Sequence, residues 1–323
     1  MLDSYDRKVL RQIAEHVVKP GALVKIVELL GRPMETALAA ARYSKNPIIQ
    51  KVQSTIANGI TVGIKKMLQA SGKSANDQQI LQSYQTQQIY IRTLSDIKDL
   101  HLEYIDSVAE GYQLSNALSV GVEGAAMGAA AALAVGTLVG AVAVPTIVAA
   151  DVSLSLALLS RNVCQIGATY GYSAQNPLNL PHFIAALAPH QSLPNESYFV
   201  GKSMALQAIY QSKQFLLYNA GRIFDEQLLG REAPQLLRLL YYVLQKLGIL
   251  VTEKELAMLL PVAGATLNGG VNVVFQKMGH QTAKDYFRIL FLEDKYGQEV
   301  VMNILQTEVN QLRRSKGSMK SGV

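Results

Sequence analysis

A long uncharged stretch constrains this 323-residue chain more than any other feature. Residues 124–150 read GAAMGAAAALAVGTLVGAVAVPTIVAA, bounded by Glu123 and Asp151. The run exceeds the roughly 20 apolar residues that a bilayer span requires. However, only eight of its 27 residues are Leu, Ile or Val, and together these favour insertion by only about −2 to −5 kcal/mol. Three roles therefore remain open: a membrane span, a buried hairpin in a helical core, or a hairpin that dips into a bilayer or holds a lipid.

Small residues recur every fourth position in this stretch. On an α-helix this spacing makes one nearly flat stripe that allows another backbone to approach closely, formed by Gly124, Gly128, Ala132, Gly136 and Gly140. Pro145 lacks a backbone N–H, so we expect it to break or kink the helix, or to start a new one after Val144.

The composition indicates which partners and which cellular compartment suit the chain. Charged residues make up 17% of it, below the usual value of about 25%, which favours contact with a membrane, a lipid or a partner. The single cysteine, Cys164, excludes an internal disulfide and fits a reducing compartment. The charged N-terminus is not that of a signal peptide, so we expect a cytoplasmic protein peripheral to the membrane. Residues 1–70 carry 11 basic against 5 acidic side chains, which suits anionic lipid.

Helical periodicity extends over most of the chain and predicts an all-α fold, with no alternating strand pattern. The clearest amphipathic helix is predicted over 78–112. Its apolar arc includes Tyr90, His101 and Tyr104, with His101 expected to be a satisfied core histidine. Five acids fall on the opposite, solvated arc, at Asp96, Asp99, Glu103, Asp106 and Glu110.

Two further apolar segments supply the polar candidates for a ligand or a helix contact. The helix predicted over 151–172 carries two charges, Asp151 and Arg161, and ends in Tyr170-Gly171-Tyr172. Asp151 must be paired, hydrated or protonated among such neighbours. Residues 256–276 form a second uncharged segment, where Asn268 and Asn272 lie one helical turn apart. Two amides on one apolar face seek partners across a helix contact or on a ligand.

The sequence lacks the common catalytic motifs. It has no Gly-x-Ser-x-Gly elbow, no dinucleotide-binding glycine loop and no His-Glu-x-x-His helix. The five histidines lack the spacing of metal ligands, and no basic–aromatic pattern indicates nucleic-acid binding. We therefore expect no cofactor, no metal and no nucleic-acid partner.

From residue 120 to 292 the chain resembles the EcsC family of bacterial proteins. The resemblance rests on the small-residue helix with Pro145, on Asp151 and Tyr170-Gly171-Tyr172, on Gly264-Ala265-Thr266-Leu267-Asn268 with Asn272, and on Tyr286-Phe287-Arg288. Many relatives place an acid soon after the Tyr-Gly pair, where this chain has Ser173-Ala174. The resemblance implies an all-α fold and a link to the membrane, and it supplies no catalytic residue.

These observations predict one multi-helix bundle with a central Ala/Gly-rich hairpin. Residues 1–70 would form basic N-terminal helices, 71–312 an EcsC-like core and 313–323 a flexible basic tail. The leading functional hypothesis is a non-enzymatic, membrane-associated protein that binds lipid or a bilayer surface. The alternatives are a soluble adaptor or regulatory protein that binds a protein partner, a secreted bacterial effector among them, and an enzyme acting on a lipid or envelope substrate. The enzyme would need Asp151 in one pocket with a nearby base or with His280.

Overall fold

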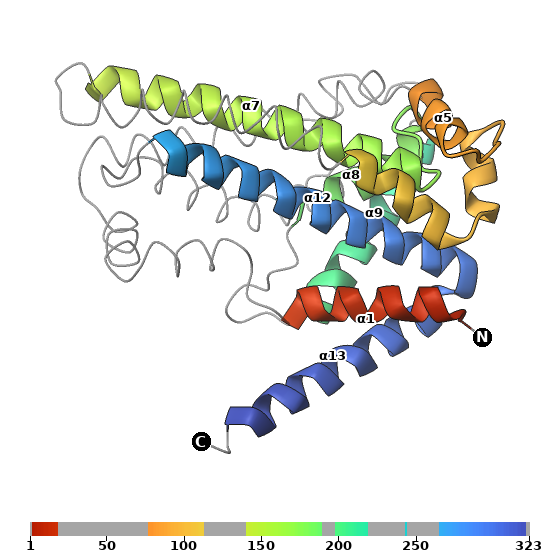
Figure 1. Cartoon of the computed structure of the whole chain (residues 1–323). Helices are drawn as coiled ribbons and strands as arrows, with labels where there is room; N and C mark the ends of the chain where they lie inside the picture. Colours follow the sequence, from red (N-terminus) through yellow and green to blue (C-terminus); the bar gives the residue numbers. More distant parts are fainter. Residues whose placement is uncertain are drawn as a thin grey trace.

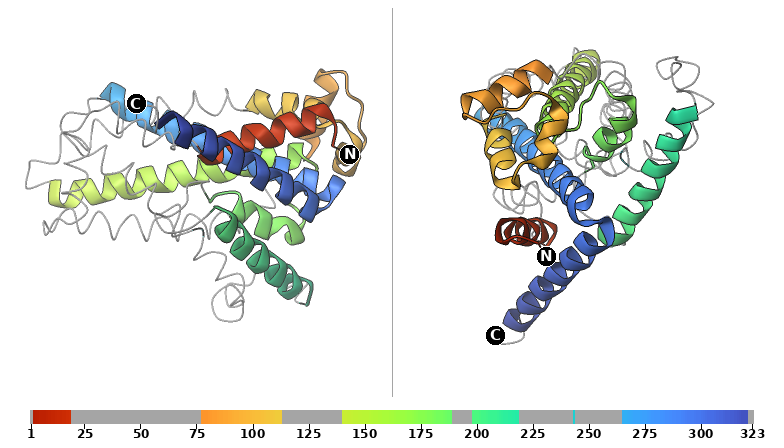
Figure 2. Two further views of the ribbon diagram at one scale, coloured as in Figure 1. Left: turned by 90° about the horizontal axis from the view of Figure 1, so that it is seen from below. Right: turned by 90° about the vertical axis from the view of Figure 1, so that its right-hand side faces the viewer.

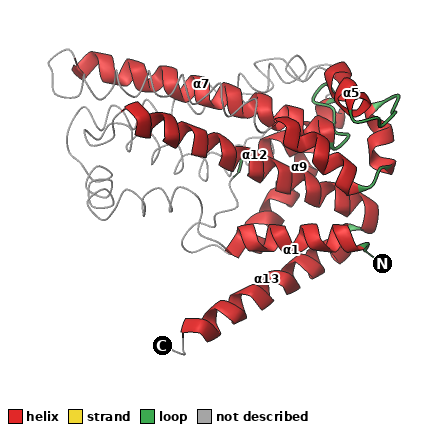
Figure 3. Cartoon of the chain, viewed as in Figure 1, coloured by secondary structure: helices red, strands yellow, loops and turns green. Residues whose placement is uncertain are grey.

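The computed structural model describes residues 2–18, 77–112, 140–188, 198–218, 243 and 265–320. Every regular element in these ranges is helical, and none of them contains a strand (Figure 1, Figure 3). The all-α prediction is therefore confirmed. In chain order the elements are α1 (Ser4–Val18), α5 (Asp77–Thr86), η1 (Leu94–Asp99), a helix over 102–112, α7 (Gly140–Thr169), η2 (Pro177–Asn179), α8 (Leu180–Ala185), α9 (Tyr198–Tyr218), α12 (Ala265–Tyr296) and α13 (Gln298–Lys320).

Two long helices, α7 and α12, form the axis of the molecule. They begin at the same end and pack against each other, so they run parallel (Figure 1). The register is constant: Gln276 Nε2 donates to the Ser155 carbonyl at 2.9 Å, Gly279 faces Leu159, and Gly167 faces Phe287. Residues of α7 and α12 that face each other thus differ in number by 120 or 121. Glycine at these contacts lets the large side chain of the partner helix lie against the backbone.

The N-terminal helix α1 packs on α13 and on the C-terminal half of α12. Its buried face consists of Val9, Leu10, Ile13 and Ala14, the helical spacing expected of a docked amphipathic helix. Polar contacts pair Asp6 with Lys295 and His16 with Asp285, so α1 runs antiparallel to α12. The predicted first helix is confirmed. Helix α9 diverges from the other helices in both views of Figure 2.

The predicted helix over 78–112 is wrong as a single helix. It is divided into α5, η1 and the helix over 102–112, because Gln88 adopts a left-handed φ of 61°. There Ile89 N–H donates to the Tyr84 carbonyl and Gln88 N–H to that of Gln85, the hydrogen bonds of a Schellman helix end. Glycine is the usual residue at such a position, and with glutamine here no turn signal marks the end of the helix.

The break at Gln88 changes which residues of the 78–112 segment are buried and which are exposed. Tyr90 is 85% exposed, and Tyr104 and His101 are also exposed, so none of them belongs to the core. Asp96 caps η1 instead of lying on a solvated helix face: its carboxylate accepts from the backbone N–H groups of Arg92 and Thr93. These hydrogen bonds lower the pKa of Asp96. Asp106 was assigned to the solvated arc and is in fact buried.

Other predicted boundaries shift because helices are longer than expected. Pro145 is the sixth residue of α7, so it removes one backbone hydrogen bond near the helix start and does not end the helix. Helix α12 continues from the uncharged segment through Arg288 without a break, and α13 reaches Lys320, into the predicted tail. Residues 124–139, with the small-residue positions from Gly124 to Gly136, lie outside the described residues; Gly140 begins α7.

We expect Gly167→Ala to lower the free energy of unfolding by about 1–3 kcal/mol, the range for overpacked cores. A Cβ at this position would lie 2.3 Å from Phe183 Cε1 and 2.7 Å from Phe287 Cζ, two buried rings. The matched control is Gly111→Ala on an exposed helix surface, where a Cβ meets nothing within 4 Å. The control should be neutral or slightly stabilising in urea denaturation. Equal effects of the two substitutions would contradict the packing described.

Candidate functional site

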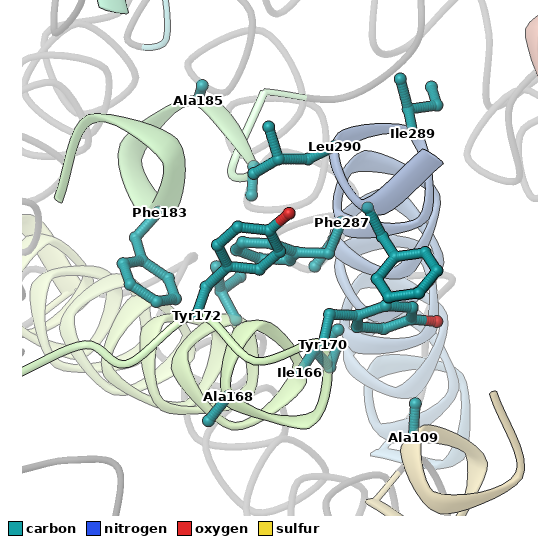
Figure 4. Close-up of a cluster of buried hydrophobic side chains, with 14 of the residues drawn as sticks. Ala109, Ile166, Ala168, Tyr170, Tyr172, Phe183, Ala185, Phe287, Ile289 and Leu290 are labelled. Atoms are coloured by element: carbon teal, nitrogen blue, oxygen red, sulfur yellow. The ribbon is translucent and has the colours of Figure 1, made fainter. Parts of the chain in front are cut away.

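The C-terminus of α7 forms a sharp corner that directs two tyrosines into the core. Tyr172 N–H donates to the Gly167 carbonyl and Gly171 N–H to that of Ala168, which completes a Schellman motif. Gly171 has a φ of +84°, and a Cβ there would lie 2.9 Å from the Leu94 carbonyl oxygen. Glycine is therefore required both for the backbone conformation and for the close approach. Tyr170 and Tyr172 lie close to Phe287 (Figure 4), with ring centroids 6.4 and 5.6 Å from it.

Tyr170 leads to a buried carboxylate that accepts four hydrogen bonds, Asp106. Its hydroxyl donates to Asp106 Oδ1 at 2.5 Å, and the Tyr5 hydroxyl from α1 donates to Oδ2 at 2.9 Å. Arg288 binds the same carboxylate with two parallel bonds, Nε to Oδ1 at 2.8 Å and Nη2 to Oδ2 at 2.7 Å. We call Tyr5, Asp106, Tyr170 and Arg288 the Asp106 cluster. It joins α1, α7, α12 and the helix over 102–112.

Burial and charge act together in this cluster. Burial alone would lower the pKa of Arg288, but the hydrogen bonds and charge of Asp106 outweigh it and raise that pKa further above its ordinary value. Burial, with the neighbouring Asp106 carboxylate, raises the pKa of both tyrosine hydroxyls. Both phenols are therefore neutral donors at physiological pH.

A second buried acid, Asp285 on α12, extends the charge pairing towards α1. Asp285 is fully buried; its Oδ2 lies 2.7 Å from His16 Nδ1, and its Oδ1 accepts from Gln281 Nε2 at 2.9 Å. Arg288 Nη1 is 3.6 Å from Asp285 Oδ1. Arg288 thus lies between two buried carboxylates. Asp106 also accepts hydrogen bonds from two tyrosine hydroxyls, and Asp285 also contacts His16 and Gln281.

Tyr172 belongs to a separate group near the surface. Its hydroxyl donates to Asp294 Oδ2 at 2.8 Å, and Lys98 Nζ donates to the same oxygen at 2.7 Å. The Lys98 ammonium also lies 4.5 Å from the centroid of the Tyr172 ring. The two tyrosines of the corner therefore hydrogen-bond to two different carboxylates, one buried and one half-exposed.

Comparison with protein families gives a match to the EcsC protein family over residues 25–292. The match covers most of the chain. The chain belongs to the EcsC family. Comparison with curated proteins and with solved structures gave no match. Helices α1 and α13 lie outside the matched range, yet Tyr5 of α1 completes the hydrogen bonding of Asp106 inside it.

The predicted site residues and the residues that carry the EcsC resemblance are only partly brought together in the structure. Tyr170, Tyr172, Phe287 and Arg288 come together in and beside the Asp106 cluster. Arg161 is exposed on α7. Asp151, Asn268 and Asn272 lie on the helical backbone of α7 and α12, and their side chains are outside the described part of the structure.

Sequence reasoning missed the acids to which these residues bind. Asp106 is predicted to face solvent, and no motif in the sequence marks Asp285 or Asp294 as a buried or paired acid. A usable signal was present in Arg288: an arginine within the aromatic Tyr286-Phe287-Arg288 run requires a buried anionic partner.

His280, the base considered for an enzyme, is buried between α7 and α12. Its Nδ1 lies 3.3 Å from Asn162 Oδ1, and its Nε2 has no hydrogen-bond partner within the described residues. Burial, reinforced by Lys284, lowers the pKa of His280 to about 4. Asn162 follows Asp151 by eleven residues on the same helix, a separation of about 16 Å along the axis. His280 and Asp151 therefore do not share one site.

The described ranges contain neither a metal-binding cluster nor a membrane span. No three or more His, Cys, Asp or Glu side chains are grouped there so as to hold a metal ion. None of the described helices combines the length and apolar character needed to cross a membrane.

We expect Arg288→Met to lower the free energy of unfolding by about 3–5 kcal/mol, because it leaves Asp106 buried without its cation. The control is Lys98→Met, which removes a cation from the half-exposed Asp294; the two side chains of that pair are 42% and 46% exposed. An exposed pair contributes about 0–1 kcal/mol. Urea denaturation of both variants measures the difference, and similar losses would show that the Asp106 cluster is not the stronger constraint.

Proposed function

We propose that this EcsC-family protein is a non-enzymatic, membrane-associated protein that binds lipid or a bilayer surface through the uncharged ends of α7 and α12. The observation that carries the proposal is the separation of charge along these parallel helices. Residues 140–160 of α7 contain one charged residue, Asp151, and residues 265–276 of α12 contain none. Both segments begin at the same end of the molecule (Figure 1).

The opposite end of the same helix pair carries the charges. Asp285, Arg288 and Asp294 lie in the C-terminal half of α12, where they pair with residues of α1, η1 and the helix over 102–112. A helix pair with a charged, hydrogen-bonded end and an uncharged, Gly- and Ala-rich end suits an interface between water and lipid. Uncharged residues can enter the hydrocarbon region without the cost of burying an ion.

A second observation concerns the outward face of α1. Arg7, Lys8 and Arg11 are exposed there, and none of them has an ion pair within the described residues. A basic residue near an anionic bilayer contributes about 1 kcal/mol of attraction. This face is the described part of the basic N-terminal region, and it supports a salt-sensitive contact with anionic headgroups.

Flotation of the purified protein with liposomes tests the proposal. We expect it to float with the vesicles, with one part of the binding resistant to high salt. Val142→Glu with Thr266→Glu places an acid in each uncharged segment and should reduce the salt-resistant part at least tenfold, since one charge in hydrocarbon costs about 2.5–3.5 kcal/mol. The control, Gln82→Glu with Gln85→Glu on the exposed face of α5, should float like the wild type. Absence of flotation, or equal flotation of both variants, would contradict the proposal.

The salt-sensitive part of the binding is tested by a charge-matched pair of triple variants. Arg7→Gln, Lys8→Gln and Arg11→Gln should weaken flotation with anionic vesicles at low salt and leave it unchanged with neutral vesicles. The control replaces Arg92, Arg313 and Arg314, which are also exposed. If both triple variants lose binding equally, net charge rather than the face of α1 governs the contact.

One observation favours the alternative of an adaptor that binds a protein partner. Helix α9 exposes three large apolar side chains, Met204, Tyr210 and Leu217, with Tyr210 65% exposed. A protein that ignores liposomes but loses a specific protein partner on Tyr210→Ser would support this alternative. The same result would remove support for the membrane proposal.

A further inference from the structure

A stripe of buried polar side chains runs along the face of α12 that packs on α7 and on the helix over 102–112. It has a member at every fourth position, each at most 5% exposed: Gln276, His280, Lys284 and Arg288. Residues four positions apart lie on one face of a helix, one turn from each other. Because buried polar groups nearly always have hydrogen-bond partners, each member of this stripe needs one.

Three members of the stripe are paired with a neighbouring helix. The partners are the Ser155 carbonyl for Gln276, Glu110 Oε1 for Lys284 and both carboxylate oxygens of Asp106 for Arg288. All of these hydrogen bonds are between 2.7 and 2.9 Å long. The stripe is thus a row of directed contacts that joins α12 to α7 and to the helix over 102–112.

His280 is the member of the stripe that is only half satisfied. Its Nδ1 lies 3.3 Å from Asn162 Oδ1, while its Nε2 has no hydrogen-bond partner within the described residues. The contact with Asn162 fixes the orientation of the ring, and the 2% exposure of His280 keeps Nε2 away from bulk water. Burial, reinforced by Lys284, lowers the pKa of His280 to about 4, so the imidazole is neutral at physiological pH.

The chemistry around Nε2 selects a neutral ligand with a hydroxyl group. If Asn162 accepts a hydrogen bond from Nδ1, then Nε2 is an acceptor; if Asn162 donates its amide proton, Nε2 carries the proton. A hydroxyl fits either tautomer because it both donates and accepts. Lys284, the nearest cation on the stripe, is paired with Glu110, so no unbalanced positive charge from this pair favours an anion.

His280 lies just beyond the uncharged segment of α12. Residues 265–276 contain no charged side chain, and Lys277 is the first charge on the helix. The facing segment of α7, residues 140–160, contains only Asp151. From residue 280 back to residue 265 the helix extends over about 22 Å. A hydrocarbon chain attached to a hydroxyl at His280 therefore has uncharged helix surface along this length.

We infer that His280 Nε2 binds the hydroxyl group of a neutral amphiphile, a long-chain alcohol or an acylglycerol, whose hydrocarbon chain follows the uncharged segments of α7 and α12. The inference rests on the proposed lipid contact of these segments and adds the chemical class of the lipid. It assigns His280 the role of a binding residue that distinguishes a free hydroxyl from an apolar chain end.

Nitrogen-15 NMR of the histidine side chains, titrated with 1-octanol in the absence of vesicles, tests the inference at the atom concerned. We expect the Nε2 resonance of His280 to shift in a saturable way. The matched probe is 1-chlorooctane, whose chain has the same length but carries no hydroxyl. It should bind at least tenfold more weakly, because it leaves the buried nitrogen without a hydrogen bond.

A pair of phenylalanine variants tests the role of His280 through thermal unfolding. A ligand that binds the folded state raises the Tm in a saturable way. His280→Phe keeps a buried ring and removes both nitrogens, so it should bind 1-octanol at least tenfold more weakly than the wild type and no better than 1-chlorooctane. The control is His101→Phe, at a side chain that is 75% exposed, and it should bind both probes like the wild type.

Three results would overturn the inference. They are an Nε2 resonance that does not respond to 1-octanol, as expected if water alone occupies the position, equal binding of the two probes by the wild type, and unchanged 1-octanol binding in His280→Phe. If His280→Phe does not fold, the comparison of the two probes on the wild type decides. Liposome binding without a response to 1-octanol would remove this site and leave the membrane proposal standing, whereas 1-octanol binding without flotation would contradict the membrane proposal alone.

Discussion

The bidentate pair between Asp106 and Arg288 is the interaction on which the described structure depends most. Both side chains are buried, at 2% and 5% exposure, so each needs the other to remain charged. The pair also fixes the positions of four helices, because Tyr5 and Tyr170 donate to the same carboxylate. Helix contacts made by apolar side chains tolerate small shifts, whereas four directed hydrogen bonds to one group do not.

This arrangement gives the molecule two ends of different character. Charge pairs and tyrosine hydroxyls hold the C-terminal halves of α7 and α12 together with α1, while close contacts at Gly279 and Ser155 continue the packing towards the uncharged ends. The rigid end can therefore hold in place two segments, 140–160 and 265–276, whose sequences together contain a single charged residue, Asp151. The EcsC family match spans residues 25–292, and α1 and α13, which cover this rigid end, lie outside it.

Part of this fold could be predicted from sequence. Helical spacing correctly gave α1, and the Tyr170-Gly171-Tyr172 motif correctly marked a corner, since glycine is the residue that a positive φ demands. The break at Gln88 could not be predicted, because a glutamine there carries no turn signal. The burial of Asp106 was missed for a related reason: once that break changes the helix phase, an acid assigned to the solvated arc turns inward. The pairing of Asp106 with Arg288 is a tertiary contact, and helical periodicity within one segment does not predict contacts between distant segments.

The central claim is that the uncharged ends of α7 and α12 enter lipid while the buried Asp106 cluster does not. Hydrogen–deuterium exchange with and without liposomes tests it most directly. The account predicts added protection in peptides covering residues 140–150 and 265–276, and unchanged exchange around Asp106, Tyr170 and Arg288. Protection confined to the charged end, or no change in any peptide of the vesicle-bound protein, would contradict it.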